Sequence, residues 1–352
     1  CMIGYHAVPV IADAWVKGLR DFDEQKAYTA MKKSSMQDHH GLEYYRKYGY
    51  IPAGMEGESV SKTLEYAYDD WCIAVMAKGL GYEDDHAEYL QRAQYYKNLF
   101  DPSAGFIRGR MNGMWTTPFD PTEVNFMLTE ANTWQYTFFV PQDVSGMMEL
   151  LGGPEQFADK LDEMFNATTG LSGRQQSDIT GLIGQYAHGN EPSHHMAYLY
   201  NFAGQPWKTQ DLVRRIMAEQ YSDQPDGLCG NEDCGQMSAW YVLSAMGFYP
   251  VTPGTDYYAT GSPAFDRVTI NLENGRQCII EAKNNSPENK YIQSATLNGE
   301  PYHQSFIRHD DIMNGGHFVF EMGHEPDMEW GSGPEEMPKT AITEQLITPA
   351  PY

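Results

Sequence analysis

The chain has 352 residues, of which 41% are hydrophobic, so it is large enough to bury one large core or two ordinary ones. Its 24 basic and 48 acidic residues give a formal net charge of −24, which disfavours nucleic acid because phosphate backbones are bound by clustered Lys and Arg. The sequence contains no apolar run of about 18 residues, so we expect no membrane span. An acidic surface is compatible with neutral sugars and with divalent cations held by oxygen ligands.

Helical periodicity runs from the start of the chain to about residue 247. In residues 61–80, apolar positions recur at spacings of three and four behind Ser61, which predicts an N-capped helix that buries one face. Comparable patterns predict helices over residues 11–19, 86–99, 154–165, 194–202, 209–221 and 236–246.

After residue 249 the pattern changes to alternation and turns, which predicts strands over residues 256–260, 267–272, 277–282, 292–297 and 317–322. Asn274-Gly275 and Asn298-Gly299 are predicted hairpin turns, because Asn and Gly tolerate positive φ angles. We therefore predict a mainly α fold: an α/α toroid over residues 1–248, with its active site at one mouth, and a C-terminal antiparallel β-sandwich domain over residues 249–352.

Four segments are dense in carboxylates, amides and histidines: residues 65–71, 129–136, 188–195 and 230–240. Acids from separate segments suit glycoside hydrolysis, in which one carboxyl protonates the leaving oxygen and another deprotonates a water molecule. Each acid has an alternative structural explanation: Asp233 could cap a helix and Glu191 could complement a helix dipole. The histidines at 188, 194 and 195 lack the spacing of a zinc hydrolase.

The segments EYAYDDW, PFDP, NTWQYTFFVPQDV, HGNEPSHH and GNEDCGQMSAWYVLSAMGFYPV follow one another in this order. Together they resemble glycoside hydrolase family 92, the calcium-dependent α-mannosidases, and the resemblance covers essentially the whole chain. It implies an inverting exo-α-mannosidase, with an α/α toroid and flanking β-sandwich domains, that acts on mannose-containing oligosaccharides or glycoprotein glycans.

The resemblance assigns roles residue by residue. It makes Glu130 the general acid and Asp233 the general base, with Glu232 as a neighbour that could share or take the role of base. Asn190 and Glu191 are the implied calcium ligands. The implied substrate contacts are His188, Glu191, Asp69, Asp70, Trp134 and Gln135. For Asp69 and Asp70 a helical ion pair is an equal alternative, and for Trp134 packing is.

One departure from the family pattern is that its chains normally begin with a β-sandwich domain, whereas this sequence opens inside the helical part. We expect that an N-terminal β-domain is missing and that it completes the sugar pocket. Two alternatives stay open: a non-catalytic glycan-binding fragment, and another inverting glycosidase on the same toroid. The resemblance to exported bacterial enzymes implies a periplasmic or secreted location, and Cys1 is interpreted as a truncated start rather than a lipidated terminus.

Overall fold

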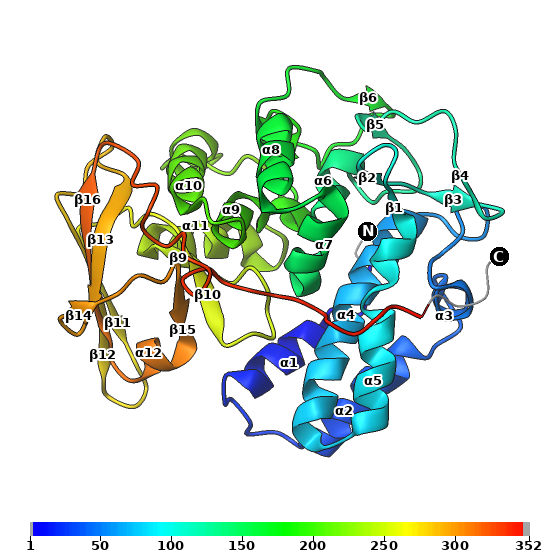
Figure 1. The fold of residues 1–352 in the computed structure, drawn as a ribbon, viewed down its shortest axis with the longest axis horizontal. Helices are drawn as coiled ribbons and strands as arrows, with labels where there is room; N and C mark the ends of the chain where they lie inside the picture. Colours follow the sequence, from blue (N-terminus) through cyan, green and yellow to red (C-terminus); the bar gives the residue numbers. More distant parts are fainter. Residues whose placement is uncertain (1–2, 348–352) are drawn as a thin grey trace.

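The computed structural model describes residues 3–347, and Cys1 lies outside them. A helical part is followed by a sheet-rich C-terminal region (Figure 1). The helices are α1 (Ala7–Val16), α2 (Glu24–Ser35), α3 (Leu42–Tyr48), α4 (Ser59–Leu80), α5 (Glu83–Arg92), α6 (Thr133–Thr137), α7 (Val144–Leu151), α8 (Pro154–Phe165), α9 (Leu199–Phe202), α10 (Pro206–Gln220), α11 (Gln236–Met246) and α12 (His309–Met313).

The predicted helices are largely confirmed, with two exceptions. The predicted helix over residues 86–99 divides into α5 and a 3-10 turn, Tyr95–Leu99, and the one over residues 194–202 consists of a 3-10 turn followed by the single turn of α9. Helices α2, α3 and α7 and the short helices α6 and α12 were not predicted. Helix α2 buries only Tyr28, Met31 and Ser35, too few positions for a recognisable apolar stripe.

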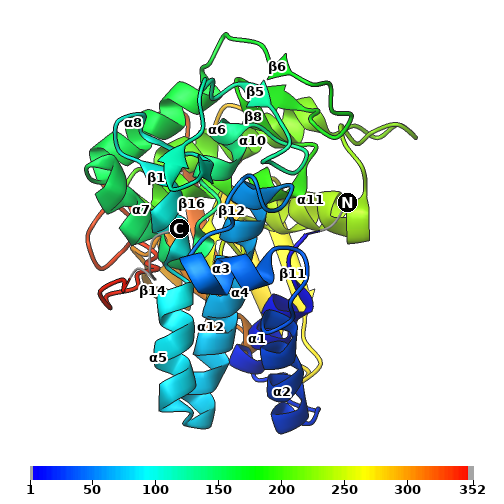
Figure 2. The ribbon, with the colours of Figure 1, turned by 90° about the vertical axis from the view of Figure 1, so that its right-hand side faces the viewer.

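Helix α4 lies in the middle of the N-terminal helices, and α1, α2 and α5 pack around it (Figure 2). It is buried on all sides rather than on one face, so even Lys62, Glu65, Asp69 and Asp70 lie in the interior. The predicted cap at Ser61 is wrong. The helix begins two residues earlier, after Glu58, and Ser61 lies inside its first turn.

The strands are β1 (Phe100–Asp101), β2 (Phe106–Ile107), β3 (Arg110–Met111), β4 (Met114–Trp115), β5 (Glu123–Val124), β6 (Ser172–Gly173), β7 (Leu182–Ile183), β8 (Tyr186–Ala187), β9 (Phe248–Tyr249), β10 (Tyr257–Thr260), β11 (Arg267–Asn271), β12 (Gln277–Lys283), β13 (Tyr291–Leu297), β14 (Glu300–Pro301), β15 (Phe306–Arg308) and β16 (His317–Gly323). The first eight form two-residue pairs among the loops of the helical part. The others form a three-stranded sheet, β15-β10-β9, and a five-stranded sheet, β11-β12-β16-β13-β14.

The larger sheet is mixed, which corrects the prediction of a purely antiparallel domain. Strand β16 pairs antiparallel with β13 but parallel with β12. Between β14 and β16 the chain passes through β15 of the other sheet and through α12, and such a crossover is what a parallel pair requires. Both predicted turns are confirmed: Gly275 has φ 80°, and Asn298 and Gly299 have φ 54° and 89°.

The two sheets share one apolar core, which Phe248, Ile307, Ile280 and Phe318 help to form. Beyond β16 the chain runs back across the molecule onto the helical part (Figure 1). There the backbone N–H of Ile342 donates to Asp143, at 2.9 Å. The end of the predicted β-domain therefore packs on helices, while the division at residues 248 and 249 stays a prediction. Within residues 3–347, no helix has the length and apolarity needed to cross a membrane.

Candidate active site

The loop that leads into α6 holds Glu130, the predicted acid, in a left-handed backbone conformation with φ 50°. This conformation costs a non-glycine residue roughly 1 kcal/mol or more, so it persists only where neighbours enforce it. On one side, the backbone N–H of Thr129 donates to Ser61 Oγ at 2.9 Å. On the other, Asn190 Nδ2 donates to the carbonyl oxygen of Glu130, also at 2.9 Å. The loop is thus fixed on both sides of the acid.

Trp134 and Gln135, which were predicted as sugar contacts, lie just beyond the same loop and make contacts that hold it. Gln135 accepts from the backbone N–H of Asn132 at 2.8 Å and donates to the carbonyl oxygen of Gln185 at 2.8 Å. Trp134 packs edge-on against Phe106, with 4.7 Å between ring centroids. Both side chains are buried and are committed to protein contacts.

Asn190 and Glu191 lie at the turn that faces this loop. Glu191 Oε1 is buried and has no hydrogen-bond partner among the described residues. Burial raises the pKa of Glu191, and the nearby carboxylates of Asp233, Glu130 and Asp178 raise it further. Charges influence one another in this way only at short range. The structure therefore brings Glu130, Glu191 and Asp233, which come from three separate segments, into one electrostatic neighbourhood.

His188, predicted to contact the leaving sugar, instead lies fully in the interior. Its ring nitrogens are 2.7 Å from the hydroxyls of Tyr186 and Tyr221. Because the Tyr221 hydroxyl donates to the carbonyl oxygen of Met237, His188 Nε2 must donate to Tyr221, which leaves Nδ1 to accept from Tyr186. Burial lowers the pKa of His188 to about 2, so the ring is neutral. Both of its ring nitrogens are therefore occupied by tyrosine hydroxyls, and a sugar contact of His188 stays a prediction.

The acids that precede α11 have different roles. Glu232 accepts from the backbone N–H of Ser238 at 3.0 Å and from its hydroxyl at 2.6 Å, and these bonds lower the pKa of Glu232. Ser238 is the third residue of α11, so Glu232, not Asp233, caps this helix. Asp233 is exposed. Two residues earlier, the side-chain amide of Asn231 donates to Asp178 at 2.9 Å.

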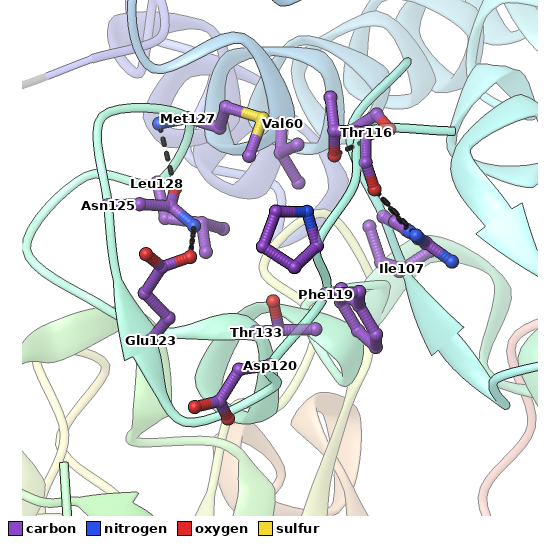
Figure 3. Close-up of a pocket in the computed structure, with 13 residues that line it drawn as sticks. Val60, Ile107, Thr116, Phe119, Asp120, Glu123, Asn125, Met127, Leu128 and Thr133 are labelled. Carbon is purple, nitrogen blue, oxygen red and sulfur yellow. Dashed lines mark hydrogen bonds between the residues drawn. The ribbon is translucent and has the colours of Figure 1, made fainter. Parts of the chain in front are cut away.

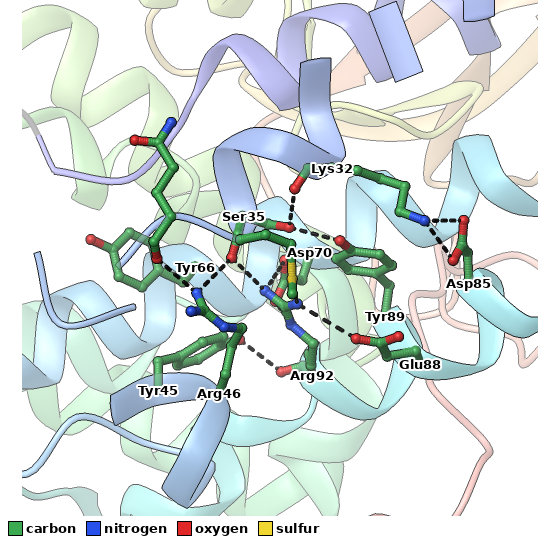
Figure 4. A network of polar contacts seen from close by, with 12 residues as sticks. Lys32, Ser35, Tyr45, Arg46, Tyr66, Asp70, Asp85, Glu88, Tyr89 and Arg92 are labelled. Carbon is green, nitrogen blue, oxygen red and sulfur yellow. Dashed lines mark hydrogen bonds and ion pairs between the residues drawn. The ribbon is translucent and has the colours of Figure 1, made fainter. Parts of the chain in front are cut away.

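Asp69 and Asp70, which were predicted as substrate contacts, are both fully buried. Arg92 binds Asp70 with its Nε at 2.7 Å and its Nη2 at 3.1 Å (Figure 4), and the hydroxyl of Tyr5 adds a bond of 2.6 Å. Asp69 accepts from the backbone N–H of Tyr5 and pairs with His6, both at 2.8 Å. Burial raises the pKa of Asp70 to about 6, against the opposing charge of Arg92. Asp69 and Asp70 therefore each have a charged protein partner, His6 and Arg92, and their role as sugar contacts stays a prediction.

A small cavity lies beside the start of α6 and the turn that contains Pro118 (Figure 3). Its volume is about 20 Å³, which accommodates about one water molecule and no hexose ring. Arg108, Asp120, Glu123 and Asn125 give it polar walls. This cavity is therefore too small to be a hexose site.

The predicted calcium ligands fit that ion in part. No group of three or more His, Cys, Asp and Glu side chains within residues 3–347 is arranged to hold a metal ion. Calcium, however, also accepts amide and backbone oxygens and water. Glu191 offers a buried oxygen without a partner, and Asn190 uses its amide nitrogen for the Glu130 carbonyl, which leaves its amide oxygen for a cation.

Sequence reasoning missed three residues that shape the site. Asp178 holds Asn231 and raises the pKa of Glu191. His6 and Tyr136 both contact Glu65, on the helix whose Ser61 accepts from the backbone beside Glu130. Tyr136 lies inside a motif that carried the resemblance, whereas no local pattern distinguishes Asp178 or His6 from ordinary surface residues.

An acid and a potential base on separate segments of a helical fold define the class of an acid–base glycoside hydrolase. The family model described as "Glycosyl hydrolase family 92 catalytic domain" matches residues 1–324. The chain therefore belongs to glycosyl hydrolase family 92.

Individual relatives agree with this assignment. An uncharacterized secreted glycosidase of Arthroderma benhamiae is 32% identical over 379 residues, which cover 95% of this chain and 47% of that protein. A family 92 α-mannosidase from Bacteroides thetaiotaomicron is 46% identical with a TM-score of 0.90, over 97% of this chain and 45% of that chain. Its complex with mannoimidazole gives a TM-score of 0.92 at 45% identity, over 97% of this chain and 46% of that chain. An inverting family 92 mannosidase from the same organism gives 0.88 at 40% identity, over 97% of this chain and 48% of that chain. The chain thus spans about half the length of the relatives it matches.

Proposed function

We propose that the protein is an inverting exo-α-mannosidase that removes terminal α-mannose from oligosaccharides or glycoprotein glycans. The observation that carries the proposal is the contact between the loop of Glu130 and the turn of Glu191, where Asn190 donates to the Glu130 carbonyl oxygen and the buried Glu191 Oε1 has no partner among the described residues; the charges of Asp233 and Glu130 add to the effect of burial on the pKa of Glu191. The similarity to family 92 mannosidases, one of them an inverting enzyme and another bound to mannoimidazole, supports the same activity. The proposed architecture is an α/α toroid followed by a β-sandwich.

In the proposed mechanism Glu130 protonates the glycosidic oxygen while Asp233 removes a proton from the attacking water. A water molecule between base and sugar requires carboxyl groups that are about 6.5–9.5 Å apart. The capping role of Glu232 leaves Asp233 as the base, since the Glu232 carboxylate is already engaged by Ser238. The exposure of Asp233 is consistent with access for water.

Calcium is the proposed cofactor, with Glu191 and Asn190 among its ligands. A bound calcium ion would supply a hard Lewis acid that holds two neighbouring sugar hydroxyls and so orients the ring. Support comes from the unsatisfied oxygen of Glu191 at the point where the acids meet.

A non-catalytic glycan-binding fragment is the second candidate, because the chain spans about half the length of its relatives. In that case an N-terminal β-domain would be needed to complete the sugar pocket. We also propose export to the periplasm or to the medium; the Arthroderma relative carries the name of a secreted glycosidase.

The decisive experiment is an assay of mannose release from α-1,2-, α-1,3-, α-1,4- and α-1,6-linked mannobioses, with and without a calcium chelator. NMR of the fresh product should show β-mannose first, because inversion changes the anomeric configuration. The Asp233→Asn variant is the control. Fresh α-mannose would refute inversion. Sugar binding without turnover by the wild-type chain would favour the glycan-binding alternative.

A further inference from the structure

His6 lies against α4, between two acids that are one helical turn apart. Its Nε2 is 2.7 Å from Glu65 Oε2, and its Nδ1 is 2.8 Å from Asp69 Oδ1. The carboxyl side chains are almost completely buried, at 5% and 0% exposure, whereas His6 is 35% exposed. A single histidine thus serves as the shared cation of two interior carboxylates.

A path of polar contacts leads from Glu65 to the loop of the proposed acid. The Tyr136 hydroxyl donates to Glu65 Oε1 at 3.1 Å, and Ser61 lies close enough to this hydroxyl to lower the pKa of Tyr136 against the effect of burial. Ser61 Oγ in turn accepts from the backbone N–H of Thr129, the residue before Glu130.

Three members of this path, Ser61, Glu65 and Asp69, recur every fourth residue and therefore form one stripe along α4. At a rise of about 1.5 Å per residue the stripe is about 12 Å long. It extends from the acid loop to the N-terminal segment that contains His6.

The contacts of the path allow only one assignment of hydrogen-bond donors and acceptors. The single hydrogen of Tyr136 goes to Glu65, so the Ser61 hydroxyl must donate to Tyr136 and is free to accept from Thr129. Both nitrogens of His6 face acceptors, which requires an N–H on each and hence the charged imidazolium. Burial opposes that charge, but Asp69 and Glu65 outweigh it and raise the pKa of His6 well above its usual value.

We propose that His6 is a positioning residue for Glu130: it neutralises Glu65 and Asp69, and thereby keeps the Tyr136–Ser61 path in the order that fixes the Thr129 backbone. The assignment rests on the proposed function, because it concerns the acid of that reaction. Without the imidazolium, Glu65 must either take up a proton or rearrange, and Tyr136 then loses its ionised acceptor. The left-handed conformation of Glu130 would then lose its support on the Thr129 side, while the bond from Asn190 remains.

The test compares His6→Gln, Tyr136→Phe and the control Tyr5→Phe in the full chain. Tyr5 lies in the same segment, and its hydroxyl binds Asp70, but that hydroxyl is outside the path to Thr129. The kinetic readouts are kcat and KM on an α-mannobiose and on 2,4-dinitrophenyl α-mannoside, whose leaving group needs little protonation. Hydrogen exchange of the Thr129 amide gives a readout that does not depend on turnover. Tyr136→Phe removes one hydroxyl only and serves if His6→Gln does not fold.

A misplaced acid loses roughly 10²-fold in rate for a shift of about 1 Å. We therefore expect His6→Gln and Tyr136→Phe to lower kcat on the mannobiose by about 10- to 100-fold, with KM little changed, and to lose far less on the aryl mannoside. The Thr129 amide should exchange faster in both variants, and Tyr5→Phe should behave as wild type.

Equal losses on both substrates, the same losses in Tyr5→Phe, or unchanged exchange at Thr129 would each overturn the positioning role. A wild-type chain that releases mannose from no substrate would overturn the proposed function instead. In that case the exchange of the Thr129 amide would still decide whether His6 holds the loop.

Discussion

Acid should destabilise this protein through the stacked pair His188 and His194, whose ring centroids are 4.8 Å apart. His194 Nε2 bonds the carbonyl oxygen of His188 at 2.9 Å, and Gln236 donates to its Nδ1 at 3.3 Å. These partners, like those of His188, suit a neutral ring. Burial lowers the pKa of His194 to about 4 and that of His188 to about 2.

The sign and size of the effect follow from these values. Both folded pKa values lie below the unfolded value of about 6.5, so the stabilisation is complete above pH 6.5 and is lost as the pH falls toward 4. Between pH 7.5 and 5.5 the unfolded chain gains almost one proton per histidine, while the folded chain gains almost none. Each ring then costs about 1.3 kcal/mol of unfolding free energy, and the pair about 3 kcal/mol.

Other groups titrate over the same range, so the assay compares the wild type with His194→Gln. Urea denaturation at pH 7.5, 6.5 and 5.5, followed by tryptophan fluorescence, measures the free energy of unfolding of each protein. Trp240 reports on this region, because its ring contacts His188 edge-on at 4.5 Å. The wild type should lose about 1.3 kcal/mol more than the variant between pH 7.5 and 5.5. Parallel pH curves for the two proteins would refute the neutral assignment of His194.

Further substitutions separate the catalytic from the structural acids. Glu130→Gln should lose about 10²- to 10⁴-fold in kcat on mannobioses but much less on 2,4-dinitrophenyl α-mannoside, and equal losses would argue against its role as the acid. Asp233→Asn should abolish turnover of both substrates. Glu232→Ala should lower the Tm but keep kcat within a few-fold of wild type. A Glu232→Ala variant that folds but is inactive would make Glu232 the base. Asp70→Asn leaves the buried Arg92 with only its longer ion pair to Glu88, at 3.8 Å, and should cost about 3–5 kcal/mol in urea denaturation with KM unchanged. A raised KM would support Asp70 as a sugar contact.

The sequence predicted the type of most long elements, because the apolar periods of α8, α10 and α11 and the alternation in β12, β13 and β16 are local properties. It could not predict the parallel pairing of β16, since pairing depends on where a crossover returns the chain. It also missed the return of the C-terminal segment onto the helices. These contacts join residues about 200 positions apart, for example Ile342 and Asp143, and no local pattern encodes them.

In the candidate site, too, local features were predicted and distant contacts were not. Local chemistry pointed to segments dense in carboxylates, and the resemblance singled out Glu130, Glu191 and Asp233 within them; in the structure the charges of Glu130 and Asp233 help to raise the pKa of Glu191. For Asp69 and Asp70 the deciding facts were distant partners, namely His6 and Arg92. A carboxyl that contacts a sugar and a carboxyl that pairs with an interior cation look alike in a sequence, because they differ only in their burial.

The polar motif in α4 illustrates why acids in an interior helix need not contact the substrate. A helix buried on all sides can carry carboxylates only if each one finds a cation or a donor, because an unpaired interior charge costs several kcal/mol. Here Asp70 finds Arg92, while Glu65 and Asp69 share His6. Since Tyr136 and Ser61 link Glu65 to the backbone beside Glu130, the pairing that makes this burial tolerable also fixes the acid loop. The same ion pairs therefore serve both the burial of α4 and the geometry of the proposed acid.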